Sequence, residues 1–73
     1  MAKTKHMLGA AVYRLRTAKG LSQSKLGELI GVSNKAVSKW ETDETNPHIR
    51  LLPRLAEALG VTTDELLASI SGF

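Results

Sequence analysis

Apolar residues recur along most of this chain at spacings of three and four positions, the pattern of helices that bury one face. Five such segments follow one another, separated by glycine, serine, threonine or proline. We therefore expect an all-α protein, a compact five-helix bundle. In the first segment the helix ends near Lys19, before Gly20, and its inward positions are Leu8, Ala11, Val12 and Leu15.

Residues 21–41 contain the second and third helices, which meet at a short turn around Gly31. Ser22 and Ser33 occupy N-cap positions, because a serine hydroxyl can accept a hydrogen bond from the free amides of a first helical turn. Gly31 suits the left-handed residue that closes the earlier helix. Gly27 has no side chain and allows the two backbones to approach closely. Two helices joined so tightly predict a helix-turn-helix, whose second helix enters the major groove of DNA.

The fourth helix should start near residue 51 or 52, because Pro53 is tolerated only in a first helical turn, and Gly60 should end it. Thr62 and Glu65 have the spacing of a capping box and predict the start of a fifth helix. Little core remains for this helix to cover, so its apolar side, with Phe73, is a candidate dimer contact. The predicted core comprises Leu15, Leu26, Leu29, Val37, Trp40, Leu52, Leu55 and Leu59.

The composition narrows the class of protein. Seventy-three residues form one domain at most, and the absence of cysteine excludes a disulfide framework and a thiolate metal site. No apolar run is long enough to span a membrane. The net charge of +3 is unevenly divided: residues 1–39 carry eight basic and one acidic side chain, and residues 40–73 carry two basic and six acidic. This asymmetry favours a polyanionic partner, although two solvated faces would give the same pattern.

The outer side of the third helix carries residue types that read DNA. If Val37 and Trp40 face the core, four polar side chains face outward, one turn apart: Asn34, Lys35, Ser38 and Lys39. Asparagine can pair with the N6 and N7 atoms of adenine, and lysine reaches guanine or a phosphate. Trp40 could instead stack on a base, but helical spacing beside Val37 predicts a place in the core.

Several short motifs occur together in one register: Leu15-Arg16, Gly20-Leu21-Ser22-Gln23, Leu26-Gly27, Gly31-Val32-Ser33, Trp40-Glu41, Pro47 and Leu55-Ala56-Glu57-Ala58-Leu59-Gly60-Val61. Over about residues 8–68 this combination resembles the Cro/cI-type (Xre) helix-turn-helix family of phage and bacterial repressors. The resemblance implies a lambda-repressor-like bundle with the helix-turn-helix at helices 2 and 3. It also implies that the base-reading positions are Asn34, Lys35, Ser38 and Lys39.

The resemblance further implies phosphate contacts and one internal ion pair. Gln23 stands at the family's phosphate-clamp position, with Ser24 and Lys25 beside it and Arg50 as a further contact. The first turn of the second helix lacks an acidic residue, which leaves its amides free for a phosphate. The resemblance also pairs Arg16 with Glu41, partly buried, although two independent surface charges are the alternative reading.

Two segments complicate this picture. Relatives usually have glycine in place of Asp43 and a basic residue in place of Glu44. Aspartate tolerates a left-handed backbone, but two carboxylates near the phosphate path must either turn outward or weaken DNA binding. Residues 1–6 carry two lysines and are expected to form a flexible N-terminal arm, frayed or lying along DNA phosphates. The DNA-binding domain would then cover residues 7–73.

We therefore expect sequence-specific binding of double-stranded DNA by a transcriptional repressor or other transcriptional regulator that forms a homodimer at least on DNA. The resemblance implies a cytoplasmic, nucleoid-associated protein of a bacterium or phage. A protein-interaction or antitoxin module with the same fold is the alternative, and Asp43 and Glu44 favour it. The chain has no catalytic or metal-binding motif, so we expect no enzyme, no cofactor, no metal, no small-molecule ligand and no membrane partner.

Overall fold

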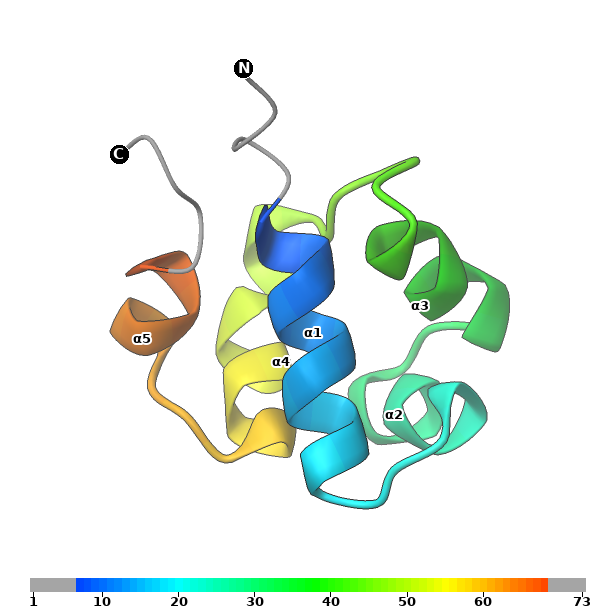
Figure 1. The fold of residues 1–73 in the computed structure, drawn as a ribbon, viewed down its shortest axis with the longest axis horizontal. Coiled ribbons are helices and arrows are strands. Elements are labelled where there is room, and N and C mark those ends of the chain that lie inside the picture. Colours follow the sequence, from blue (N-terminus) through cyan, green and yellow to red (C-terminus); the bar gives the residue numbers. More distant parts are fainter. Residues whose placement is uncertain (1–6, 69–73) are drawn as a thin grey trace.

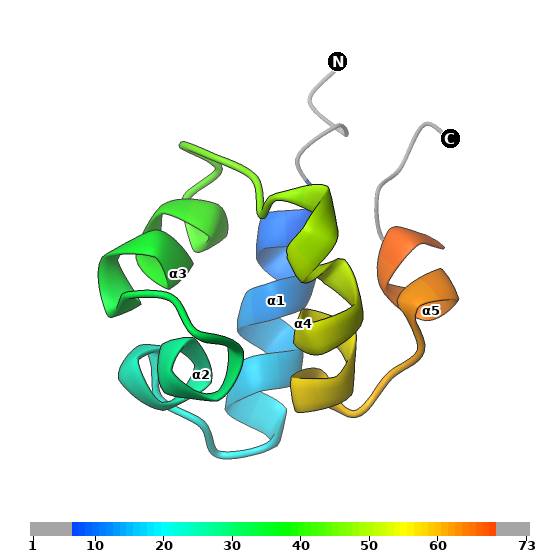
Figure 2. The ribbon, with the colours of Figure 1, turned by 180° about the vertical axis from the view of Figure 1, so that it is seen from behind.

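Helices make up most of residues 7–68, the part of the chain that the computed structural model describes. They are α1 (Met7–Ala18), α2 (Gln23–Ile30), α3 (Asn34–Glu41), α4 (Leu52–Leu59) and α5 (Thr63–Ala68), with a 3₁₀ turn, η2 (Ile49–Leu51), leading into α4. The all-α five-helix bundle is confirmed. In Figure 1, α1 and α4 lie in the middle, with α2 and α3 on one side and α5 on the other, and Figure 2 shows the same order from behind.

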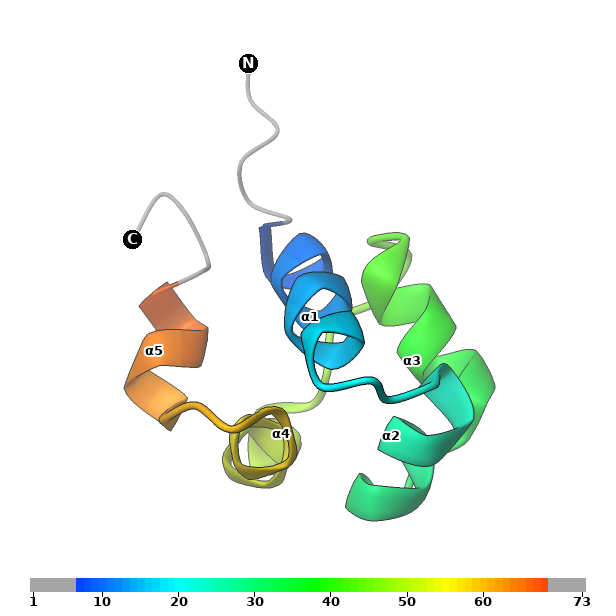
Figure 3. The same ribbon diagram turned by 60° about the horizontal axis from the view of Figure 1, so that its bottom comes forward.

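One apolar core receives side chains from all five helices. Its buried members are Leu8, Ala11, Val12, Leu26, Ile30, Val37, Trp40, Leu52, Leu55, Ala56, Leu59 and Leu66. Leu15 packs at its edge, half-buried. Figure 3 shows α2 and α3 together on the side of the bundle opposite α5. The helix-turn-helix therefore packs on the core through one side only and keeps its other side open.

The capping predictions are confirmed, and they explain where the helices begin. Ser22 Oγ and Ser33 Oγ each accept a hydrogen bond from the amide three residues further on, at 2.9 and 3.2 Å. Thr62 and Glu65 cap α5 reciprocally: Glu65 N donates to Thr62 Oγ1 (3.0 Å) and Thr62 N donates to Glu65 Oε1 (2.8 Å). Each cap satisfies amides that a helix start leaves without a partner.

The turn between α2 and α3 depends on two glycines. Gly31 has a φ of 84°, in the left-handed region, and its amide and that of Val32 both donate to the carbonyl oxygen of Gly27, each at 2.8 Å. A Cβ atom on Gly27 would lie 2.5 Å from the carbonyl oxygen of Val32. Any side chain there would push the turn away from α2, so the close approach predicted for Gly27 is confirmed.

The segment before α4 is only partly as expected. Pro53 does lie in the first turn of α4, which the proline ring tolerates. The preceding 3₁₀ turn was not predicted. It begins after His48, whose side-chain Nδ1 accepts a hydrogen bond from the amide of Arg50 at 3.1 Å. His48 therefore caps η2.

The prediction that Leu29 belongs to the core is wrong, because 53% of this residue is exposed. The buried residues of α2 are Leu26, Gly27 and Ile30. Since successive residues of a helix are rotated by about 100°, burying Gly27 against the turn rotates the inward face away from Leu29. Leu29 instead borders a surface groove next to α4, whose other lining residues are Arg54, Glu57 and Ala58.

None of the helices within residues 7–68 combines the length and apolar character that crossing a lipid bilayer requires. The expected N-terminal arm, residues 1–6, and Phe73 of the candidate dimer contact lie outside the described residues.

The two leucines of α2 provide a matched test of this packing. Leu26→Ala should lower the free energy of unfolding by about 2–5 kcal/mol, because it leaves a cavity in a fully buried site. Leu29→Ala should lower it by less than about 1 kcal/mol, because the side chain is already half in water. Urea unfolding followed by circular dichroism measures both. Equal losses would contradict the orientation of α2.

Candidate nucleic-acid interface

The rotation of α3 about its axis is set by its two buried residues, Val37 and Trp40. Asn34, Lys35 and Lys39 are exposed, and Ser38 is half-buried. Lys35 and Lys39 are four residues apart, so they lie one helical turn apart on the side away from Trp40.

These outward side chains are not engaged within the protein. Asn34, Lys35 and Lys39 make no side-chain hydrogen bond or ion pair with any other residue of the described range, 7–68. A donor that already had an internal partner would lose that bond on meeting a ligand. Asn34, Lys35 and Lys39 have no internal hydrogen bond to lose, so their side chains can bind an external acceptor without that cost.

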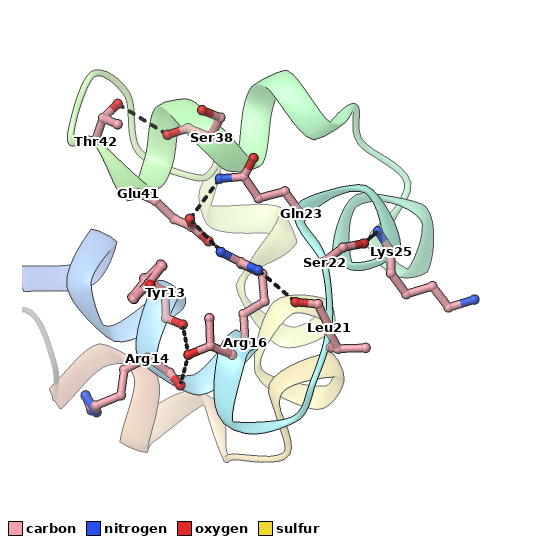
Figure 4. A network of polar contacts seen from close by, with 11 residues as sticks. Tyr13, Arg14, Arg16, Leu21, Ser22, Gln23, Lys25, Ser38, Glu41 and Thr42 are labelled. Carbon is pink, nitrogen blue, oxygen red and sulfur yellow. Dashed lines mark hydrogen bonds and ion pairs between the residues drawn. The ribbon is translucent and has the colours of Figure 1, made fainter.

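A bidentate ion pair between Arg16 and Glu41 links the end of α3 to α1, as Figure 4 shows. Arg16 Nε donates to Glu41 Oε2 at 2.6 Å, and Arg16 Nη2 donates to Glu41 Oε1 at 3.1 Å. Arg16 Nη1 also donates to the carbonyl oxygen of Leu21 at 2.7 Å. Only 10% and 6% of the two side chains are exposed, so the predicted buried pair is confirmed.

The surroundings keep the Arg16 guanidinium charged. Its hydrogen bonds to the Glu41 carboxylate raise the pKa of Arg16, more than burial lowers it, and the nearby Glu41 charge acts in the same direction. The Tyr13 ring lies under the guanidinium, with 5.4 Å between the ring centroid and Cζ.

Gln23, the first residue of α2, is held by the same carboxylate. Its Nε2 donates to Glu41 Oε1 at 2.9 Å, and the side chain is half-buried (Figure 4). This contact was not predicted from the sequence, because residues 23 and 41 become neighbours only after α2 and α3 cross. Ser24 and Lys25 are exposed beside it, and Lys25 makes only a long, exposed contact of 3.5 Å with Glu28.

The amino end of α2 offers further donors. The first amides of a helix have no intrahelical acceptor, and the Ser22 hydroxyl takes only that of Lys25. The first turn of α2 contains no acidic residue. This end therefore presents backbone amides, the Gln23 side chain and a lysine, which together suit an anion. Arg50 is exposed in η2, beyond the loop that follows α3.

The loop after α3 places its two carboxylates differently. Asp43 has a φ of 66°, so the predicted left-handed backbone is confirmed. Its Oδ1 lies against the first turn of α1, where a side chain on Gly9 would collide with it. The Glu44 carboxylate accepts a hydrogen bond from Thr42 Oγ1 at 3.1 Å and is exposed. Of the two acids, Asp43 therefore faces α1.

A capped helix pair crossing at a glycine turn, with polar side chains on the second helix and free amides on the first, defines the helix-turn-helix class. The chain belongs to the helix-turn-helix family, whose model matches residues 12–66. The resemblance to the Cro/cI-type family is thereby confirmed.

Proteins similar in sequence carry the names of transcriptional regulators or repressors. Over 61 residues the chain is 38% identical to the repressor protein C2 of Salmonella phage P22, covering 84% of this chain and 28% of the relative. It is 34% identical over 61 residues to the prophage-derived HTH-type transcriptional regulator YonR of Bacillus subtilis (84% and 56% covered). It is 42% identical over 55 residues to the HTH-type transcriptional activator BcrR of Enterococcus faecalis (75% and 27% covered).

The fold agrees with these relationships. The crystal structure of the P22 C2 repressor protein in complex with a synthetic operator matches with a TM-score of 0.79 and 37% identity, covering 85% of this chain and 94% of that one. The chain spans 56% of the length of YonR and about a quarter of the lengths of BcrR and the C2 repressor. The similarity to those relatives thus concerns their helix-turn-helix portion.

Removing one member of the buried pair should be costly. Arg16→Met should lower the free energy of unfolding by about 3–5 kcal/mol, because the Glu41 charge is left buried without its partner. Replacing both, as Arg16→Met with Glu41→Leu, should cost less than the single change. Lys25→Met in the exposed pair with Glu28 is the control and should change stability by less than about 0.5 kcal/mol.

The same measurement has a defined pH dependence. Because the pKa of Arg16 is raised in the folded state, its contribution is complete below the ordinary guanidinium pKa and is lost only as the pH rises through the higher, folded value. The pH range in which this contribution is lost lies above about pH 12. The difference between wild type and Arg16→Met should therefore be the same at pH 6 and pH 9. A difference that shrinks across this range would contradict the assignment.

Proposed function

We propose that this chain is the sequence-specific, double-stranded-DNA-binding part of a transcriptional regulator, with α3 lying in the major groove. The observation that carries the proposal is the exposed side of α3, where Asn34, Lys35 and Lys39 lack internal partners while Trp40 anchors the opposite side. A major groove is wide enough to admit one α-helix. The likeness to the operator-bound C2 repressor supports this orientation.

Two sets of residues take different roles in this proposal. Asn34, Lys35, Ser38 and Lys39 contact base edges, where an asparagine pairs with adenine and a lysine with guanine. Gln23, Ser24, Lys25 and Arg50 contact phosphates, which fix the register of the protein on the duplex and carry no sequence information. The free amides at the start of α2 reinforce the second set.

We further propose a repressor that binds as a homodimer. The name of the C2 relative supports repression, although the relative BcrR is named an activator. One recognition helix reads only a half-site, and paired half-sites lie about 34 Å apart. A protein acting on bacterial or phage DNA works in the cytoplasm, and the proposal contains no catalytic step.

The interaction-module alternative was favoured by the two acidic side chains after α3. Both are exposed, but Asp43 Oδ1 lies against the first turn of α1 and Glu44 accepts a hydrogen bond from Thr42, whereas Asn34, Lys35 and Lys39 on α3 have no side-chain partner within residues 7–68. The DNA-binding candidate is therefore the one we retain.

Selection of binding sequences from a random duplex library tests the function directly. We expect enriched sites that contain two half-sites about one helical turn apart, and binding that weakens steeply with salt as phosphate counterions are released. If no sequence is enriched, or if the salt dependence is flat, the proposed function is wrong.

Two single variants separate the two roles. Lys39→Ala should relax operator preference, lowering affinity for the selected site by about 1–3 kcal/mol with little change on mixed DNA. Gln23→Ala should weaken binding to selected and mixed sequences alike, because phosphates are the same everywhere. Fluorescence anisotropy on both duplexes measures this. If both variants kept wild-type affinity for the selected operator, the proposed docking would be refuted.

A further inference from the structure

One carboxylate oxygen links the internal ion pair to the proposed phosphate contact. Glu41 Oε1 accepts one hydrogen bond from Arg16 Nη2 (3.1 Å) and another from Gln23 Nε2 (2.9 Å), as Figure 4 shows. We infer that Glu41 is a positioning residue for DNA binding: it fixes the Gln23 amide so that the second N–H of Nε2 is presented to a phosphate. This inference rests on the proposed function and describes how that surface holds the DNA backbone.

The chemistry of the amide makes the arrangement directional. A glutamine side chain has two N–H donors on its nitrogen and an acceptor oxygen. The nitrogen of Gln23 must face Glu41, because a carbonyl oxygen would be repelled by the carboxylate. One N–H is thus bound to Glu41, and the other has no acceptor among residues 7–68. An unheld glutamine would present oxygen as readily as nitrogen to a phosphate, and it would lose rotamer freedom on binding.

Arg16 is what makes a carboxylate tolerable so close to a phosphate. An unpaired negative charge beside the amino end of α2 would repel DNA. Here the Arg16 guanidinium contacts the other oxygen, Oε2, at 2.6 Å, and both side chains are nearly buried. The pair carries no net charge. Glu41 therefore acts toward Gln23 as a hydrogen-bond acceptor without presenting a net negative charge to the DNA.

Glu41→Leu distinguishes positioning from charge, because a leucine has no acceptor for the Gln23 amide and the two effects have opposite signs. Removing the carboxylate leaves Arg16 uncompensated, and an added positive charge by itself strengthens binding to a polyanion. Losing the hold on the Gln23 amide weakens binding by about tenfold, the effect of one well-made hydrogen bond. A fall in affinity therefore reports positioning, and an unchanged or higher affinity overturns the inference.

A double-mutant cycle on the selected operator tests whether Glu41 acts through Gln23. We expect Glu41→Leu and Gln23→Ala each to weaken binding by about tenfold, and the double variant to bind no more than about twofold weaker than either. Since Gln23 is uncharged, its replacement should leave the slope of affinity against salt unchanged. Independent, multiplying effects of the two substitutions would overturn the inference while leaving the proposed function intact.

The cycle requires folded variants, so binding is measured at low temperature after circular dichroism has shown each variant to be folded. Leu59→Ala is the control, because it removes a buried side chain of α4, outside both the helix-turn-helix and the candidate dimer contact. This variant should be destabilised and yet bind the operator within about twofold of wild type. If it binds as weakly as Glu41→Leu, the loss reflects stability alone and the inference is wrong.

A spectroscopic test on the wild-type protein avoids the need for a folded Glu41 variant. In nuclear magnetic resonance spectra of the wild type, the two Gln23 side-chain amide protons should already differ widely in the free protein, because one is bound to a carboxylate. Adding operator should shift the other proton. If operator shifts the backbone resonances of α3 but neither Gln23 amide proton, the inference is wrong and the proposed function stands. If no duplex binds at all, both are wrong.

Discussion

The contact between the Arg16 guanidinium and the Glu41 carboxylate holds three helices in place at once. Arg16 belongs to α1 and also binds the carbonyl oxygen of Leu21 just before α2, while Glu41 ends α3. Two charges this shielded from water attract strongly, yet each has lost much of its hydration, so the pair is favourable only because its donors and acceptors are matched. The cost of breaking it explains why the helix-turn-helix keeps one geometry.

The packing of the other helices covers only one side of α3 and leaves the other side exposed. The helix has two turns, and Val37 and Trp40 are enough to bury its inner side in the common core. The glycine turn brings α2 across it so closely that the amino end of α2 lies beside the end of α3, as the Gln23–Glu41 contact shows. A surface of lysines, amides and one glutamine results from the way two short helices are packed.

Local signals in the sequence predicted most of this fold, because they act over three or four residues. The serine caps, the Thr62–Glu65 capping box and the place of Pro53 all depend on neighbours in the chain, and all are confirmed. The Arg16–Glu41 pair, 25 residues apart, required the family resemblance. Leu29 was misplaced because periodicity cannot tell which of two adjacent rotations a helix adopts, and the Gln23–Glu41 contact depends on the crossing itself.

The isolation of the outward side chains of α3 has a consequence for how such a protein can change. Asn34, Lys35 and Lys39 support nothing else in residues 7–68, whereas Gln23 is bound into the polar network that holds the bundle together. Under the proposed docking, exchanging Asn34, Lys35 or Lys39 alters which bases are read and leaves the scaffold untouched, whereas exchanging Gln23 disturbs both the phosphate contact and the scaffold. If α3 reads the bases as proposed, diversification toward new operators is open on α3 and constrained on α2, so a lineage can acquire new targets while keeping one mode of contact with the DNA backbone.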